Sequence, residues 1–133
     1  MNTIFQVNDY YKLLSLHRAL MEAKFAEQPN DPDISGSRFV AEMADQVIEM
    51  LITMEKERGH SEKAARWSEW RKISESRREW QIALDRLRTC RSWEKWSVIE
   101  KTDYAKILFS PLTVDDELLK VFIRKGDSML VSN

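Results

Sequence analysis

The chain has 133 residues, a length that suits one ordinary domain with a core of its own. Only three glycines and three prolines are present, while 43% of the residues are apolar and 32% are charged. This composition favours continuous helices over a turn-rich β fold and excludes extensive disorder. We therefore expect an all-α fold: a compact single-domain helical bundle over residues 1–133, with three long helices followed by shorter C-terminal helices.

Cysteine content and hydropathy indicate a cellular compartment. Cys90 is the single cysteine, so no intrachain disulfide bond can form, and a reducing cytosol is the natural setting. The first residues carry no basic segment followed by an apolar signal region. The apolar runs are far shorter than the roughly 20 residues that a membrane-spanning helix needs. We expect a cytoplasmic protein with no membrane partner.

The net charge of −1 conceals two oppositely charged segments. Residues 1–60 carry six basic and ten acidic side chains, whereas residues 61–101 carry eleven basic and seven acidic ones. Such segregation can steer charged partners toward a surface. It also arises when oppositely charged helices pack side by side. The sequence leaves both explanations open.

Two long helices are predicted in the first half of the chain. The first runs from a cap at Asn8 or Asp9 to about Gln28. The second begins at its cap, Ser37, and ends at Arg58. Apolar residues recur along the second helix at the spacing of a broad buried face, which comprises Phe39, Val40, Met43, Ala44, Val47, Ile48, Leu51 and Met54.

A third long helix is predicted from its cap, Ser61, to about Thr89, because no helix breaker lies between them. At 1.5 Å per residue it would be about 42 Å long. The segment SESRR at 74–78 is its weakest part, where a kink or break is expected. Arg77 falls in the apolar seam of this helix, so it either pairs with a buried carboxylate or reaches solvent through a bend.

The C-terminal third is predicted to form shorter elements. A turn or helix covers 93–101, and another covers 103–109. The last helix is capped by Thr113 and terminated by Gly126, with acidic residues in its first turn and basic residues in its last. The remaining residues, 127–133, are expected to form a loose or packed-down tail.

Five tryptophans are the most unusual feature of the sequence. Trp80 has the helical spacing of a core residue. Trp67 and Trp70 are three residues apart and cannot both lie deep in one narrow seam. Either they pack in the core, with at least one at its rim, or they form a contact patch with Arg66 and Arg71, because aromatic residues and arginines are enriched in binding hot spots.

Three acidic residues of the second helix, Glu42, Asp45 and Glu49, lie on one side of it. Any of them could supply the carboxylate that a buried Arg77 requires. Otherwise they form an acidic stripe that faces solvent or a partner. Such a stripe can mimic phosphate charge toward a basic nuclease.

The segment AEMADQVIEML at 41–51 contains Glu42 and Asp45 in a Glu-x-x-Asp arrangement on an amphipathic helix. It resembles one half of the motif of all-α nucleotide pyrophosphohydrolases of the MazG type. The resemblance implies a hydrolase that holds magnesium between helices, with a Glu-x-x-Glu pair on the preceding helix as the other half. Here the first helix offers Glu22 and Glu27, five apart, which departs from that pattern.

Nucleic-acid binding is a further alternative, since many basic residues lie in the predicted third helix. Acidic residues are interspersed among them, and the pI near 6.2 argues against nucleic acid as the partner. The basic residues are Arg66, Arg71, Lys72, Arg77, Arg78, Arg86, Arg88 and Arg91.

Metal and cofactor sites find no support in the sequence. His17 lies within the apolar face of the first helix, as a core histidine or as a polar group directed into a cavity. With two distant histidines and one cysteine, the sequence lacks metal-binding spacings. We expect no metal and no cofactor.

These observations favour an interaction protein over an enzyme. We expect a small bacterial or phage protein that binds and inhibits another macromolecule, as immunity proteins, antitoxins and phage inhibitors do. Its partner would be another protein, a toxin or a nuclease. The predicted partner-binding residues are Glu42, Asp45, Glu49, Arg66, Trp67, Trp70 and Arg71.

Overall fold

The computed structural model describes residues 5–131, and helices dominate this part of the chain. The all-α expectation is confirmed, since the described residues form no named strand and contain one isolated bridge, between Lys72 and Thr113. The six α-helices are α1 (Tyr10–Lys24), α2 (Arg38–Glu57), α3 (Ser61–Trp70), α4 (Arg78–Arg86), α5 (Val98–Phe109) and α6 (Asp116–Val131), and two single 3-10 turns lie at Leu87–Thr89 and Trp93–Lys95.

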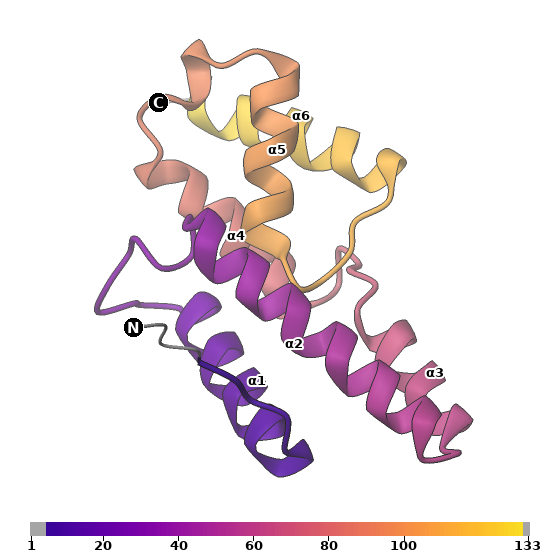
Figure 1. The fold of residues 1–133 in the computed structure, drawn as a ribbon. Helices are drawn as coiled ribbons and strands as arrows, with labels where there is room; N and C mark the ends of the chain where they lie inside the picture. Colours follow the sequence, from indigo (N-terminus) through magenta and orange to yellow (C-terminus); the bar gives the residue numbers. More distant parts are fainter. Residues whose placement is uncertain (1–4, 132–133) are drawn as a thin grey trace.

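The three N-terminal helices pack together, with α2 running between α1 and α3 (Figure 1). Asp9 caps α1 by accepting a hydrogen bond from the Lys12 amide, and Ser37 caps α2 by accepting one from the Val40 amide, as predicted. Gly59 follows α2 with φ of 79°, a left-handed conformation that glycine adopts without strain. The buried residues of this N-terminal core are Leu13, Val47, Ile48, Leu51, Ile52 and Ala64.

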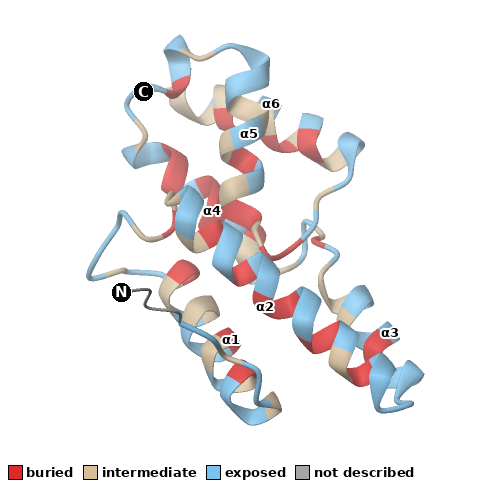
Figure 2. Cartoon of the chain, viewed as in Figure 1, coloured by how far each residue is buried: buried red, intermediate tan, exposed pale blue. Residues whose placement is uncertain are grey.

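The second half of the chain builds a C-terminal core from α4, α5 and α6. Trp80 is 3% exposed, stacks on Phe109 with ring centroids 5.7 Å apart, and meets Phe122 edge-on at 5.4 Å. The predicted core role of Trp80 is therefore confirmed. Figure 2 shows the buried segments concentrated where these helices meet α2.

The predicted third helix from Ser61 to Thr89 is wrong as a continuous element. It is broken by a non-helical segment, 71–77, that separates α3 from α4, so the break expected at 74–78 is confirmed but begins earlier, at Arg71. There the Thr113 amide donates to the Arg71 carbonyl at 2.7 Å, and the Ile73 amide donates to the Thr113 carbonyl at 2.9 Å. This backbone pairing replaces helical hydrogen bonds and buries Ile73 in the C-terminal core, so the break has a long-range cause.

Arg77 stabilises the broken segment. Its guanidinium donates to the Trp70 carbonyl and to the Lys72 carbonyl at 3.2 Å, and it pairs with Glu79 at 3.3 Å. The same group lies 5.3 Å from the centroid of the Trp70 ring. The helix is interrupted near Arg77 as predicted, but both predicted roles of its side chain are wrong: it neither pairs with an α2 carboxylate nor extends into solvent. Arg77 instead satisfies carbonyls left open where α3 ends.

The end of α1 also differs from prediction, because the helix stops at Lys24. Two carbonyls just beyond it are occupied by arginines of α4: Arg78 donates to the Phe25 carbonyl at 2.8 Å, and Arg86 donates to the Ala26 carbonyl. Cations at the negative end of a helix are favourable. These contacts join the N-terminal helices to α4.

Two helix starts differ from prediction. Ser61 lies inside α3, and His60 precedes the helix without a side-chain cap. Ser97 forms a capping box with Glu100, so the two pieces predicted at 93–101 and 103–109 are instead a 3-10 turn and the continuous helix α5.

The last helix begins and ends later than predicted. Thr113 is paired with the 71–73 segment, and Asp115 accepts a hydrogen bond from the Leu118 amide at 2.8 Å where α6 begins. Gly126 does not end the helix but lies inside α6. A Cβ at this position would come within 2.5 Å of the Leu87 side chain. Close packing explains this glycine. Most of the predicted tail is therefore helical, and 132–133 lie outside the described residues.

Candidate functional site

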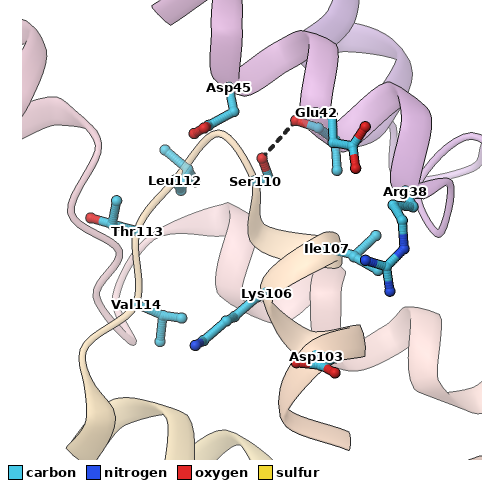
Figure 3. A pocket seen from close by; sticks show the side chains of 11 residues that line it. Arg38, Glu42, Asp45, Asp103, Lys106, Ile107, Ser110, Leu112, Thr113 and Val114 are labelled. Carbon is cyan, nitrogen blue, oxygen red and sulfur yellow. Dashed lines mark hydrogen bonds between the residues drawn. The ribbon is translucent and has the colours of Figure 1, made fainter. Parts of the chain in front are cut away.

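A pocket of about 470 Å³ lies between α2, α5 and the loop at 110–114 (Figure 3). Ser110 positions this loop, since its hydroxyl donates to the Ala41 carbonyl of α2 at 2.9 Å. The lining side chains come from three elements and include acidic, basic and apolar groups. They are Arg38, Ala41, Glu42, Asp45, Asp103, Lys106, Ile107, Ser110, Leu112, Thr113 and Val114.

Charged groups of both signs border this pocket without neutralising one another. Within the described part of the chain, no ion pair within 4 Å involves Arg38, Glu42, Asp103 or Lys106. Figure 3 shows Arg38 and Glu42 projecting from α2 while Asp103 and Lys106 project from α5. These four side chains are exposed and free to engage charged groups of another molecule.

Arg71 organises the acidic side of α2. Its guanidinium binds both Asp45 and Glu49, and its Nε donates to the Pro111 carbonyl at 3.0 Å. The Arg71 side chain is 11% exposed, whereas those of Asp45 and Glu49 are 51% and 60% exposed. The acidic and basic segments of the sequence therefore meet at Arg71. Of the predicted stripe, Glu42 has no ion pair among the described residues.

The outward side of α2 also carries large apolar side chains. Phe39 is 74% exposed, Met43 is 50% exposed and Met50 is 40% exposed. Their spacings of four and seven residues place them on one side of the helix, next to the side that bears Glu42. The prediction that Phe39 and Met43 belong to the buried face is wrong, because α1, α3 and α5 cover only part of the circumference of α2. We call Phe39, Glu42, Met43 and Met50 the α2 face.

The predicted patch of tryptophans and arginines is divided in the structure. Trp67 and Trp70 are half-buried against His17, whose ring centroid lies 5.3 and 5.1 Å from theirs. Arg66 is exposed beside them, whereas Arg71 turns to α2. His17 is 7% exposed, and burial lowers the pKa of its imidazole. Trp67 and Trp70 thus belong in part to the N-terminal core.

The arrangement implied by the hydrolase resemblance is not assembled. Among residues 5–131, no group of three or more histidine, cysteine, aspartate or glutamate side chains could hold a metal ion. Glu42 and Asp45 border one pocket, but Glu22 and Glu27 are not gathered there with them.

The basic residues do not form one phosphate-binding surface either. Arg71, Arg77, Arg78 and Arg86 each bind carbonyl or carboxylate oxygens within the chain. A guanidinium engaged in this way is less available to neutralise phosphates. Arg66 is exposed and has no ion pair in the described region.

No known family model, curated protein or solved structure shows detectable similarity to this chain. Over residues 5–131, none of the helices combines the length and apolar character needed to span a bilayer. The site must therefore be interpreted from its own geometry.

Proposed function

We propose that this protein binds another protein through the α2 face and the adjoining pocket, and thereby blocks its partner's activity. The observation that carries the proposal is the exposure of Phe39, Met43 and Met50 along one side of a well-anchored helix. Methionine and aromatic side chains are enriched at protein interfaces, where their burial supplies most of the binding free energy. Inhibition then follows from occupying the partner's own functional surface.

The charges beside the α2 face indicate the partner's chemistry. Glu42 is exposed, Asp45 and Glu49 are more than half exposed, and Asp103 borders the same pocket. The positive charge of Arg71, whose side chain is less exposed, compensates part of the negative charge of Asp45 and Glu49. A partner surface complements this arrangement if it has an apolar centre, basic groups opposite the acidic side chains and acidic groups opposite Arg38 and Lys106. The basic groups are what a nuclease or another protein that binds phosphate groups would supply.

The rigidity of α2 favours such a role. The helix is capped by Ser37, and its inner side contributes Val47, Ile48 and Leu51 to the N-terminal core. Because its side chains are presented on a preorganised helix, little conformational entropy is lost on association. The α2 face is therefore suited to docking without refolding.

Site-specific photo-crosslinking tests the proposal in the organism that encodes the protein. A photoreactive phenylalanine analogue at position 43 is expected to form a covalent adduct with one partner. The matched control places it at Ile99, which is 74% exposed on α5. The isolated partner should lose activity when the unmodified protein is added in equimolar amount. An adduct from position 99 but not from position 43, or a partner with undiminished activity, would contradict the proposal.

A further inference from the structure

The outward side of α2 carries a straight row of uncharged side chains. They recur at alternating steps of four and three residues, and all of them are exposed. Figure 2 shows exposed segments recurring along the helix in the same way. The row consists of Phe39, Met43, Gln46, Met50 and Thr53. We call these residues the α2 row.

The spacing of the α2 row indicates what kind of segment can cover it. A repeat of about 3.5 residues nearly matches the about 3.6 residues of a helical turn, so the side chains stay aligned toward one neighbour. Such a row packs between the side chains of a second helix that crosses at about 20°. Phe39 and Thr53 are 14 positions apart, which is about 21 Å along the axis. A helix of about four turns therefore matches the row in length.

One polar residue interrupts the apolar part of the α2 row. Gln46 lies between Met43 and Met50, and all three side chains are exposed. A helix that docks here buries the Gln46 amide, which then requires a hydrogen-bond partner. A single polar side chain in such a row fixes the register of two packed helices. The matching helix therefore carries apolar residues and one polar residue opposite Gln46.

Two glutamates border the apolar part of the α2 row on one side. Glu42 and Glu49 each lie one position before a methionine of the row, where the flanking charges of packed helices meet. Glu42 has no ion pair in the part of the chain that the structure describes. Glu49 is bound by Arg71, yet its side chain remains 60% exposed. Lysine or arginine on the docked helix complements both glutamates, whereas a second copy of α2 presents the same glutamates and matches less well.

We propose that the α2 row is covered by an amphipathic helix of the partner protein, which has apolar side chains along its contact stripe and basic side chains beside Glu42 and Glu49. This helix belongs to the partner of the proposed function, on which the inference rests. A helix-on-helix contact also suits the fold. The described residues form no named strand, so they offer no sheet edge with which an extended partner segment could pair.

Two synthetic helical peptides of about five turns test the inference without the natural partner. Both carry leucines at the spacing of the α2 row and one asparagine opposite Gln46, but their flanking residues are lysines in one peptide and glutamates in the other. In NMR titrations of ¹⁵N-labelled protein, the lysine peptide should cause saturable shifts of α2 amide signals. It should bind at least about tenfold more tightly than the glutamate peptide. Absence of saturable shifts on α2, or equal binding by the two peptides, would overturn the proposal.

Substitutions of exposed side chains connect peptide binding to the α2 row. Met43→Asp should weaken binding of the lysine peptide at least about tenfold, and Ile99→Asp on α5 should leave it unchanged. Glu42→Gln should weaken it about threefold, and Glu22→Gln on α1 should not. Equal affinities within these pairs would place the peptide elsewhere and overturn the proposal. Shifts of α2 signals that grow with protein concentration alone would assign the row to a second copy and would also overturn it.

Crosslinking to the natural partner reports the backbone form of the docked segment. Positions 43 and 50 are seven residues apart on α2, which is about 10.5 Å along its axis. Adducts from photoreactive residues at these positions should map to partner residues about seven apart in one helix, whereas an extended segment spans this distance in about three residues. A spacing near three, or adducts in unrelated segments, would overturn the helical partner and leave the proposed function standing. If no adduct forms, the proposed function is contradicted, and the peptide titration alone decides whether the α2 row binds a helix.

Discussion

Lys24 provides the sharpest test of the packing described above. It is 1% exposed at the end of α1, where its Nζ donates to the Ile107 carbonyl at 2.7 Å. Burial lowers the pKa of Lys24 from 10.5 to about 8. This lower pKa corresponds to roughly 3 kcal/mol by which burial disfavours the charged form of Lys24 in the folded protein.

The sign of the pH dependence follows from linkage. Between the folded-state and unfolded-state pKa values of Lys24, the unfolded chain holds a proton that the folded protein has released. Raising the pH therefore stabilises the fold, and the penalty is fully present below about pH 8. Relative to Lys24→Met, the free energy of unfolding of the unmodified protein should rise by about 2–3 kcal/mol between pH 7 and pH 10.

Urea denaturation at a series of pH values, followed by tryptophan fluorescence, measures this difference. Lys12→Met is the matched control, because Lys12 is an exposed lysine on the same helix. Its unfolding free energy should follow that of the unmodified protein across the series. If Lys24→Met and the unmodified protein show the same pH dependence, Lys24 is not buried as the structure has it.

Three further predictions concern stability, each measured by urea denaturation. Gly126→Ala should cost about 1–3 kcal/mol, because its Cβ would overlap Leu87, whereas Ser128→Ala on the same helix should be nearly neutral; equal midpoints would contradict the packing. Arg71→Ala should cost about 1–3 kcal/mol, and an unchanged midpoint would show that its contacts are not structural. Because burial lowers the pKa of His17, stability should fall as the pH drops below 6.5, and His17→Phe should remove this component; an equal acid response would contradict its burial.

The elements that the sequence predicted well are those with local signals. The cap at Ser37 and the end of α2 before Gly59 depend on residues within one turn of each other. Trp80 was predicted in the core from its spacing along a single helix. In both cases, neighbouring residues determine the outcome.

A break at 74–78 was predicted from the local segment, but its beginning at Arg71 depends on pairing with Thr113, some forty residues further along the chain, and no local pattern contains that information. The assumption of a continuous third helix also led to the wrong arginine being predicted to pair with the carboxylates of α2. An arginine does pair with Asp45 and Glu49, but it is Arg71, because the assumption of a continuous helix placed Arg77 in the seam. Gly126 likewise has the sequence context of a helix end, yet it lies inside α6. Glycine is needed there because the Leu87 side chain packs closely against its backbone.

The candidate site was predicted in part. Glu42 was identified from its spacing, whereas Phe39 and Met43 were assigned to the core, since helical periodicity cannot show how much of a helix its neighbours cover. The pocket itself combines α2 with α5 and a loop at 110–114, so it exists only in the folded chain. The burial of Glu55 was missed although a signal existed, since Glu55 lies four residues after Leu51 and seven after Ile48, on the buried face of α2.

The central claim is that the α2 face binds a protein partner, and the dissociation constant of the purified complex tests it most directly. Phe39 and Ile99 are both 74% exposed, so Phe39→Asp and Ile99→Asp introduce the same charge at equally accessible positions. Calorimetric titration should show binding weakened at least about thirtyfold by Phe39→Asp and unchanged by Ile99→Asp. Equal dissociation constants for the two variants would contradict the account.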